Sequence, residues 1–211
     1  MTPTTLLRDL QFRLEYGLLR LVVGTVRIVP LSFATRSSAW CWRRLAPIVN
    51  PKRHKRALDN LAIAFPEKSD AERLQIALKH WENLGMVMAE TMRIDELVAH
   101  PERITIKNQP VFERYSNKLG PIVGASLHMG NWELAIWPLT VSGAMPAAVY
   151  RSVNNPYVDR YLRDQRKDLY PGGLYGRGRV EGDHGESQKT ARAIMDFVRQ
   201  GGRLGVVCDL Y

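Results

Sequence analysis

The second half of the chain alternates short apolar runs with amphipathic stretches, and this alternation constrains the fold more than any other feature. Three runs have the length and composition of buried strands: 122–127, 147–151 and 203–208. Helical patterns lie between them at 132–141, 156–168 and 187–199. Such alternation is typical of an α/β fold, which binds ligands at the carboxyl ends of its strands. We expect a mixed sheet flanked by helices.

A glycine-rich segment interrupts this pattern. Six glycines between 171 and 185 predict a loop. Its Gly-Arg-Gly-Arg sequence is not that of a phosphate-binding loop, because the Lys-Ser/Thr pair and the strand–loop–helix setting are missing. The sequence then ends at Tyr211, soon after an apolar run. We therefore expect the 211 residues to be a C-terminally truncated chain.

An apolar segment interrupted by arginines opens the chain. Residues 6–29 are dense in Leu, Val and Ile, but the uncharged stretch at 21–26 is far shorter than the roughly 20 apolar residues of a simple spanning helix. Arg13, Arg20 and Arg27 recur every seven residues and share one stripe. A basic stripe beside a broad apolar face is typical of helices at an anionic membrane surface. Packing of this helix on its own domain is the alternative.

The domain organisation follows from these patterns. We expect an N-terminal membrane-associated helical segment at 1–50 and an α/β domain at 51–211. Within the latter, Ser69-Asp70-Ala71-Glu72 has the form of a capping box and predicts the start of a long helix. Apolar residues and a glycine follow at helical spacing and indicate the buried face of that helix: Leu74, Leu78, Trp81, Gly85, Met88 and Met92.

The net charge indicates which classes of molecule the protein can bind. The chain has 30 Lys and Arg against 21 Asp and Glu, a net charge of +9, which suits nucleic acid, anionic lipid or an acidic protein. Many basic residues gather at 51–56, near the apolar helix, and not in a groove lined with exposed aromatic residues, as single-stranded nucleic acid would require. Cys41 and Cys208 lie far apart and indicate neither a disulfide framework nor a paired metal motif.

The residue types that carry chemistry gather at the turn after the strand at 122–127. His128 ends that strand, and Glu133 lies five residues later, across Gly130. A carboxylate beside a histidine fixes its tautomer and stabilises the imidazolium, so the pair would form a general base for a hydroxyl group. Neither a His-Glu-x-x-His motif nor a Cys/His cluster is present in the sequence, so metal ligation is not indicated.

The segment 128–133 resembles the His-x-Gly-Asn-Trp-Glu box of the lipid A biosynthesis acyltransferases, the lauroyl/myristoyl branch of the lysophospholipid acyltransferase superfamily. An upstream block is similar to that family's Arg-Ala-x-x-Asn-Leu-x-x-Ala-Phe-Pro segment: Arg56-Ala57, Asn60-Leu61 and Ala64-Phe65-Pro66. A downstream block also resembles it: Tyr150-Arg151, Asn155-Pro156, Asp159 and Arg166. Asp209 lies where the family often has Asp-Gln, although here the sequence is Asp-Leu-Tyr.

The resemblance implies a glycerolipid-acyltransferase-like fold and an acyltransferase of the bacterial inner membrane, acting at its cytoplasmic face. The reaction would transfer a fatty acyl chain from an acyl carrier protein thioester to a hydroxyl of a lipid A precursor. His128 would be the base and Glu133 its orienting carboxylate. Arg166 would bind a phosphate or the oxyanion, with Arg151 as the other candidate. The expected substrate contacts are Gly130, Asn131, Tyr150, Arg151, Asn155 and Asp209.

No metal or cofactor is expected, because a thioester donor is already activated. The expected partners are the acyl carrier protein, an anionic glycolipid acceptor and inner-membrane lipids, without nucleic acid. Two other functions remain open: acylation of a glycerophospholipid or a phosphatidylinositol mannoside, and a non-enzymatic basic protein that binds membrane or nucleic acid. Arg151 and Arg166 have an alternative role as well, in surface ion pairs with Asp159 or Asp164.

Overall fold

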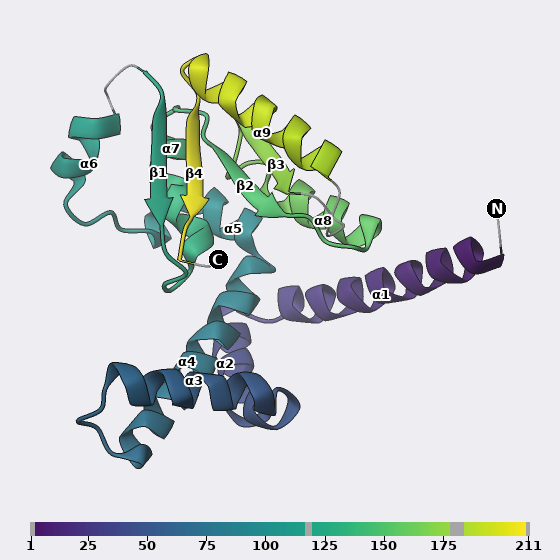
Figure 1. Cartoon of the computed structure of the whole chain (residues 1–211), viewed down its shortest axis with the longest axis vertical. Helices are drawn as coiled ribbons and strands as arrows, with labels where there is room; N and C mark the ends of the chain where they lie inside the picture. Colours follow the sequence, from purple (N-terminus) through teal and green to yellow (C-terminus); the bar gives the residue numbers. More distant parts are fainter. Residues whose placement is uncertain (1–2, 117–119, 178–183, 210–211) are drawn as a thin grey trace. The chain divides into compact units, whose positions relative to one another are not determined.

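The computed structural model describes residues 3–116, 120–177 and 184–209 (Figure 1). The chain forms two compact units, one of Met1–Leu21 with Ile94–Tyr211 and the other of Val22–Arg93. This division differs from the boundary expected at residue 50. It falls inside the first helix, α1 (Pro3–Ile28), because the first part of α1 belongs to the α/β unit.

The α/β unit is built on a four-stranded sheet. Its strands are β1 (Ile122–Ser126), β2 (Ala147–Arg151), β3 (Gly173–Arg177) and β4 (Arg203–Val207), in the order β1-β4-β2-β3. The three strands predicted from apolar runs are confirmed. Every pair is parallel, so the expectation of a mixed sheet is wrong. Helical crossovers explain the parallel order, because each returns the chain to the edge at which the previous strand began.

Strand β3 was not predicted, since its glycines indicate a loop. Gly173–Arg177 pairs residue by residue with Ala147–Arg151 of β2. Gly176 permits this pairing, because a Cβ there would lie 2.5 Å from Ser152 Oγ. Gly176 therefore reflects close packing against side chains of β2 and of the loop after it. The rest of the predicted loop includes 178–183, which lie outside the described residues.

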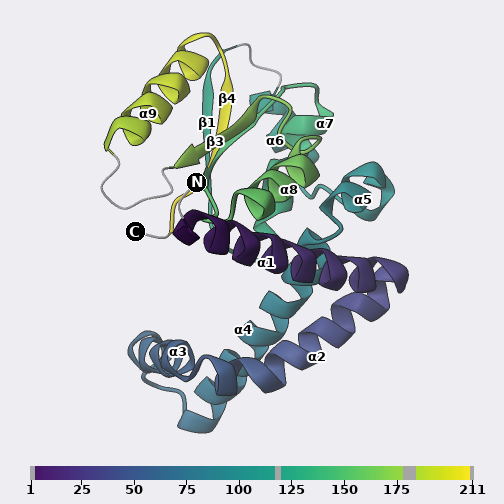
Figure 2. The ribbon, with the colours of Figure 1, turned by 90° about the vertical axis from the view of Figure 1, so that its right-hand side faces the viewer.

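Helices cover both faces of the sheet. One face carries α9 (His184–Arg199), and the other carries α7 (Trp137–Val141) and α8 (Pro156–Arg166) (Figures 1 and 2). The 3₁₀ helix η2 (Trp132–Ile136) precedes α7. Before the sheet the chain forms α5 (Ile94–Ala99), the 3₁₀ helix η1 (Pro101–Arg103) and α6 (Gln109–Ser116). A buried core joins α5, the η2–α7 segment and the end of α8: Ile94, Ile136, Trp137 and Leu169.

The second unit consists of helices, including α2 (Leu31–Val49), α3 (Pro51–Ala64) and α4 (Asp70–Thr91). The predicted capping box is confirmed: Ser69 Oγ accepts from the Glu72 amide at 3.3 Å, and Glu72 Oε2 accepts from the Ser69 amide at 2.8 Å. Helix α4 crosses α2 at Gly85. A Cβ there would lie 2.6 Å from the Ser38 carbonyl oxygen, so glycine permits the close approach.

The arginine stripe of α1 contacts protein groups. Arg13 binds Asp9 at 2.8 Å and lies over the Tyr157 ring. Arg20 donates to the Tyr16 hydroxyl at 3.0 Å, and its guanidinium lies 4.9 Å from the centre of the Tyr161 ring of α8. In the helical unit, Arg27 donates to the Met92 carbonyl oxygen at 3.3 Å. The Arg13 side chain is still 65% exposed, so the stripe contacts protein groups while its orientation toward lipid headgroups stays a prediction.

The apolar face of α1 is exposed. Six leucines are each more than half exposed: Leu6, Leu7, Leu10, Leu14, Leu18 and Leu21. At 100° per residue they occupy a sector of roughly 120° on the helix. Within the described ranges, none of the helices has the length and hydropathy needed to cross a bilayer.

Candidate active site

The carboxyl edge of the sheet brings two distant segments together. Ser126 at the end of β1 is in register with Val207 at the end of β4. The Cys208 amide then donates to the Ser126 carbonyl oxygen at 3.0 Å, which extends the pairing beyond the strands. His128 and Asp209 each lie two residues past their strand. Adjacent parallel strands therefore deliver both residues to one point of the edge.

His128 and Asp209 form a doubly hydrogen-bonded pair. The ring Nδ1 of His128 lies 2.6 Å from Asp209 Oδ1, and the backbone amide of His128 donates to Oδ2 at 3.0 Å. An ionised carboxylate can only accept, so Nδ1 carries the hydrogen in the neutral ring and Nε2 keeps its lone pair. The imidazole is thus held in the tautomer that can accept a proton at Nε2.

These bonds also set the charge of Asp209. The hydrogen bond from the His128 ring, followed by that from the His128 amide, holds the pKa of the Asp209 carboxyl below its usual range. The carboxylate is therefore ionised at neutral pH. Trp132 adds a second contact to the imidazole, with ring centres 5.1 Å apart in an edge-on arrangement. Both side chains of the pair are about one-third exposed, so a substrate can reach them.

Glu133 does not occupy the place that its sequence spacing suggested. Glu133 is the second residue of η2, and its side chain points to α8. There Arg166 donates from Nε to Glu133 Oε2 at 2.9 Å and from Nη2 to Oε1 at 2.6 Å. The expected pairing of His128 with Glu133 is replaced by His128 with Asp209. The physical reason is that a buried carboxylate, here 12% exposed, is satisfied best by a planar guanidinium in a two-point contact.

The same contact gives Arg166 a structural partner that the sequence did not predict. Its guanidinium is mostly buried and pairs with Glu133 in place of Asp159 or Asp164, and its binding of a phosphate or an oxyanion stays a prediction. Nearby, burial raises the pKa of the Tyr170 hydroxyl, and the negative charge of Glu133 adds to that effect. The cluster therefore ties η2 to the end of α8.

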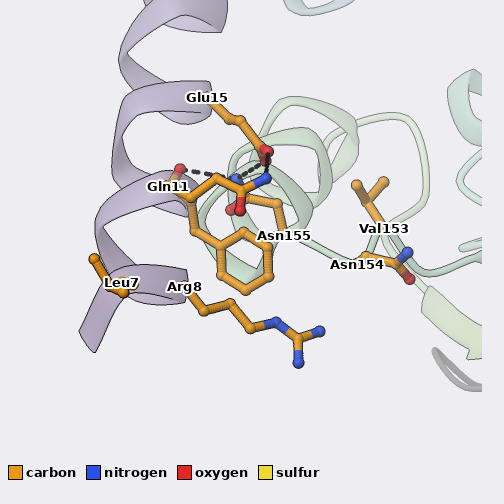
Figure 3. Close-up of a pocket in the computed structure, with 8 residues that line it drawn as sticks. Leu7, Arg8, Gln11, Glu15, Val153, Asn154 and Asn155 are labelled. Atoms are coloured by element: carbon orange, nitrogen blue, oxygen red, sulfur yellow. Dashed lines mark hydrogen bonds between the residues drawn. The ribbon is translucent and has the colours of Figure 1, made fainter. Parts of the chain in front are cut away.

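Asn155 holds the start of α8 against α1 (Figure 3). It is buried and caps α8, where its Oδ1 accepts from the amides of Tyr157 at 3.0 Å and Val158 at 3.3 Å. Its Nδ2 donates to the Phe12 carbonyl oxygen at 2.8 Å and to Glu15 at 2.9 Å. These four bonds use the whole capacity of the amide. The substrate contact expected for Asn155 is therefore replaced by a junction between α1 and α8.

Tyr150 also points into the protein. Its hydroxyl lies 3.2 and 3.1 Å from the two carboxylate oxygens of Asp159, which is 1% exposed. The Val153 amide donates to the same carboxylate at 2.9 Å. This buried carboxylate therefore shapes the loop that follows β2.

The other predicted contacts lie at or near the strand ends. Gly130 has a φ of 53°, in the left-handed region that favours glycine, and it allows the tight turn between β1 and η2. Asn131 is half-buried and precedes η2, while Arg151 ends β2 and is exposed. Among the described residues, no group of three or more His, Cys, Asp or Glu side chains could hold a metal ion.

Sequence reasoning named Asp209 but missed its role as the partner of His128. The one available signal was positional, since both residues follow predicted strands at their carboxyl ends. That signal becomes decisive only once β1 and β4 are known to be neighbours, and the two lie 81 residues apart in the chain.

A sequence model of the family described as bacterial lipid A biosynthesis acyltransferase matches residues 11–170. The matched part contains the His128 turn, Glu133, Asn155 and Arg166, whereas Asp209 lies beyond it. A comparison with curated proteins finds no match.

Proposed function

The chain belongs to the bacterial lipid A biosynthesis acyltransferase family, and on that premise we propose that it transfers a fatty acyl chain from an acyl carrier protein thioester to a hydroxyl group of a lipid A precursor. Acyl transfer to a lipid acceptor follows from the family. The donor, the acceptor and the residues that act are the proposal. The observation that carries it is the His128–Asp209 pair at the carboxyl edge of the sheet.

In this mechanism His128 is the general base. Its Nε2 takes the proton of the acceptor hydroxyl as the hydroxyl oxygen attacks the thioester carbonyl carbon. The new C–O bond forms, the C–S bond breaks, and the imidazolium returns the proton to the thiolate that leaves. Asp209 holds the ring in place and stabilises the imidazolium, because its carboxylate is already hydrogen-bonded to Nδ1–H.

Glu133 and Arg166 act as positioning residues in this proposal. Their two-point contact fixes η2, which carries Trp132 against the His128 ring. A family motif that spans His128 and Glu133 is therefore consistent with two tasks. The histidine performs the chemistry, and the glutamate orients the turn through Arg166.

The basic segment at the start of α3 supports an acidic protein as donor. Lys52, Arg53 and Arg56 are exposed, whereas Lys55 is neutralised by Asp59 at 2.7 Å. Positive charge on an exposed helix increases the rate of encounter with an acidic partner such as an acyl carrier protein.

The exposed leucines of α1 support binding at a membrane surface. In this proposal the leucine sector, and not the arginine stripe, lies in the headgroup boundary of the inner membrane at its cytoplasmic face. An amphipathic helix binds there through buried apolar area, with basic residues at the border of the apolar sector. The acceptor lipid would then reach the protein from the bilayer.

The test uses the full chain with an acyl carrier protein thioester and a lipid A precursor, with the product identified by mass spectrometry. We expect a lipid heavier by one acyl group, and no such product with His128→Ala at equal folding. A general base contributes about 10²–10⁴-fold to the rate. A variant that kept more than about a tenth of the rate would contradict the role of His128, and absence of the acylated lipid with the unaltered chain would contradict the proposed reaction.

A further inference from the structure

Helix α2 of the helical unit presents large apolar side chains to solvent. Phe33, Trp40 and Ile48 are each more than half exposed. At 100° per residue, these three side chains share a sector of roughly 80° that runs from the first turn of the helix to its last. A helix of a soluble domain normally turns its large apolar residues to the core and its polar residues to water. The outward sector of α2 is therefore apolar where amphipathic packing would place polar residues.

The inward side of α2 is already packed. Its buried residues are alanines, among them Ala39 and Ala46, which lie on the side of the helix away from the exposed sector. Small side chains permit a close crossing with α4, where a Cβ at Gly85 would lie 2.6 Å from the Ser38 carbonyl oxygen. The core of this unit therefore uses the small residues of α2, and the large apolar residues of the outward sector are not part of it.

The exposed sector lies in the part of the chain that carries the net charge. Residues 16–58 contain nine basic residues and no acidic one, so the rest of the chain has 21 of each kind. Within α2, Arg44 lies inside the apolar sector and Arg36 borders it, and both are exposed. Arg43, by contrast, turns to α4, where it binds Glu82 at 3.4 Å. The surface therefore combines large apolar side chains with positive charge that no acid on α2 offsets, since the helix contains none.

This combination fits an anionic lipid surface. Contiguous exposed apolar side chains mark interaction sites, and a tryptophan ring is suited to the level of the headgroups. Basic residues beside them are attracted to the negative charge of the lipids. An acidic protein is served better by the start of α3, where exposed basic residues follow one another at 52–56 without a large apolar side chain. The apolar and basic surface of α2 therefore points to a bilayer.

We propose that the outward sector of α2 is a second membrane-binding surface, which lies in the headgroup boundary of an anionic bilayer. Phe33, Trp40 and Ile48 enter the apolar side of that boundary, and Arg36 and Arg44 contact lipid phosphates. The inference goes beyond the proposed reaction, because it needs neither an acyl donor nor an acceptor. It also goes beyond α1, because α2 belongs to the helical unit, which therefore has its own affinity for the bilayer.

The experiment observes Trp40 directly. The full chain is mixed with vesicles of phosphatidylcholine and phosphatidylglycerol whose acyl chains carry bromine, a contact quencher of tryptophan fluorescence. The chain has five tryptophans, so the same titration is run with Trp40→Phe, which keeps an apolar ring. The difference between the two chains reports Trp40 alone. We expect this difference signal to be quenched and shifted to shorter wavelength, and both effects to be weaker with phosphatidylcholine alone.

Two pairs of substitutions separate the apolar part of the surface from the charged part. Phe33→Gln with Ile48→Gln should weaken binding to both kinds of vesicle by about tenfold or more, because each apolar side chain that leaves water contributes to the affinity. Arg36→Gln with Arg44→Gln should weaken binding to the anionic vesicles by about 10- to 30-fold and leave binding to phosphatidylcholine vesicles unchanged.

Matched controls come from α9. Met195→Gln removes an exposed apolar side chain, and Arg192→Gln removes an exposed positive charge. Both should keep the affinity of the unaltered chain for the vesicles. All variants are compared at equal melting temperature, which is expected because every substituted side chain is exposed.

Three results would overturn the inference. The Trp40 signal could remain unquenched with anionic vesicles, which would place α2 away from the bilayer. The substitutions on α2 could leave vesicle binding unchanged and instead raise the KM for the acyl carrier protein donor, which would make this sector a surface for an acidic protein. With Leu10 and Leu14 replaced by Gln, Trp40 could stay unquenched at every lipid concentration, so that α2 would only follow α1. Failure of the proposed acyl transfer is distinguishable, because Trp40 would then still be quenched in a chain that forms no acylated product.

Discussion

At the scale of single residues, the site depends on which carboxylate meets which base. The described residues around the turn after β1 include two acids, Asp209 and Glu133, and two basic groups, His128 and Arg166. The structure pairs the partly exposed acid with the imidazole and the buried acid with the guanidinium. This arrangement leaves the histidine accessible to substrate and places the permanent charge pair inside the protein, where a lone charge would be unfavourable.

Asp209→Asn should reduce kcat by at least tenfold with little change in melting temperature. The amide cannot stabilise the imidazolium as a carboxylate does, and it can hold the wrong tautomer. The lowered pKa of Asp209 keeps this carboxyl ionised above about pH 4, so an acid limb of the pH–rate profile near neutrality belongs to another group. An unchanged kcat in Asp209→Asn would exclude Asp209 from catalysis.

Glu133→Gln should lower the melting temperature by several degrees. Removing one charge of a buried pair leaves the other uncompensated, which destabilises a protein by up to about 3–5 kcal/mol. The variant is compared with Glu113→Gln, at an exposed position on α6, by thermal unfolding and by turnover on the same preparations. A large loss of turnover at a constant melting temperature would instead support direct action of Glu133 on His128.

At the scale of elements, the helices depend on a few small or polar residues at their ends and at the points where two helices cross. Helix α4 shows both kinds, because its N-terminus is capped by Ser69 and Glu72 and its middle contacts α2 at Gly85. The cap is a local feature that lies within four residues of sequence. The crossing at Gly85 joins segments 47 residues apart, where Ser38 Oγ donates to the Gly85 carbonyl oxygen at 2.7 Å.

Gly85→Ala should destabilise the protein by about 1–3 kcal/mol, because the added methyl group would overlap the α2 backbone. The matched control is Gly17→Ala in α1, where a Cβ meets nothing within 4 Å. That control should be neutral or stabilising by up to about 1 kcal/mol, since alanine favours the helix. Chemical denaturation measures both. Equal effects of the two substitutions would show that the crossing is not tightly packed.

Ser69→Ala should cost about 1 kcal/mol of stability at pH 7 through loss of the cap. The hydrogen bonds from Ser69 hold the pKa of Glu72 below its usual 4.5, so their contribution is present above that value and is lost as the pH falls through the lower, folded-state pKa. The difference between the variant and the unaltered chain should therefore shrink on acidification. Denaturation midpoints at pH 7 and pH 4 measure it, and a difference that grew at low pH would contradict this linkage.

At the scale of the whole molecule, α1 presents three different sectors. One carries the arginines that contact α8 and the end of α4, one lines a pocket beside the loop that follows β2 (Figure 3), and one exposes leucines. The first two sectors contact the protein's own groups, and the proposed membrane binding uses the third.

Replacing Leu10 and Leu14 together with Gln should weaken binding to anionic vesicles by more than tenfold. Each leucine side chain contributes about 1.5–3 kcal/mol when its apolar surface leaves water. Co-sedimentation measures the binding, with Met195→Gln on α9, another exposed apolar residue, as the control. The reverse pattern, release by Arg13→Glu with Arg20→Glu and none by the leucine variants, would assign the membrane contact to the arginine stripe.

The sequence by itself determined the features that short segments encode. Apolar runs predicted β1, β2 and β4, the Ser69 box predicted the start of α4, and the residues of the His128 turn carried the family. The tertiary structure alone decided the parallel order of the strands, the addition of β3, the pairing of His128 with Asp209 and that of Glu133 with Arg166. Periodicity identifies which residues share a face of an element, but which groups lie opposite that face depends on strand order and helix packing between residues far apart in the chain.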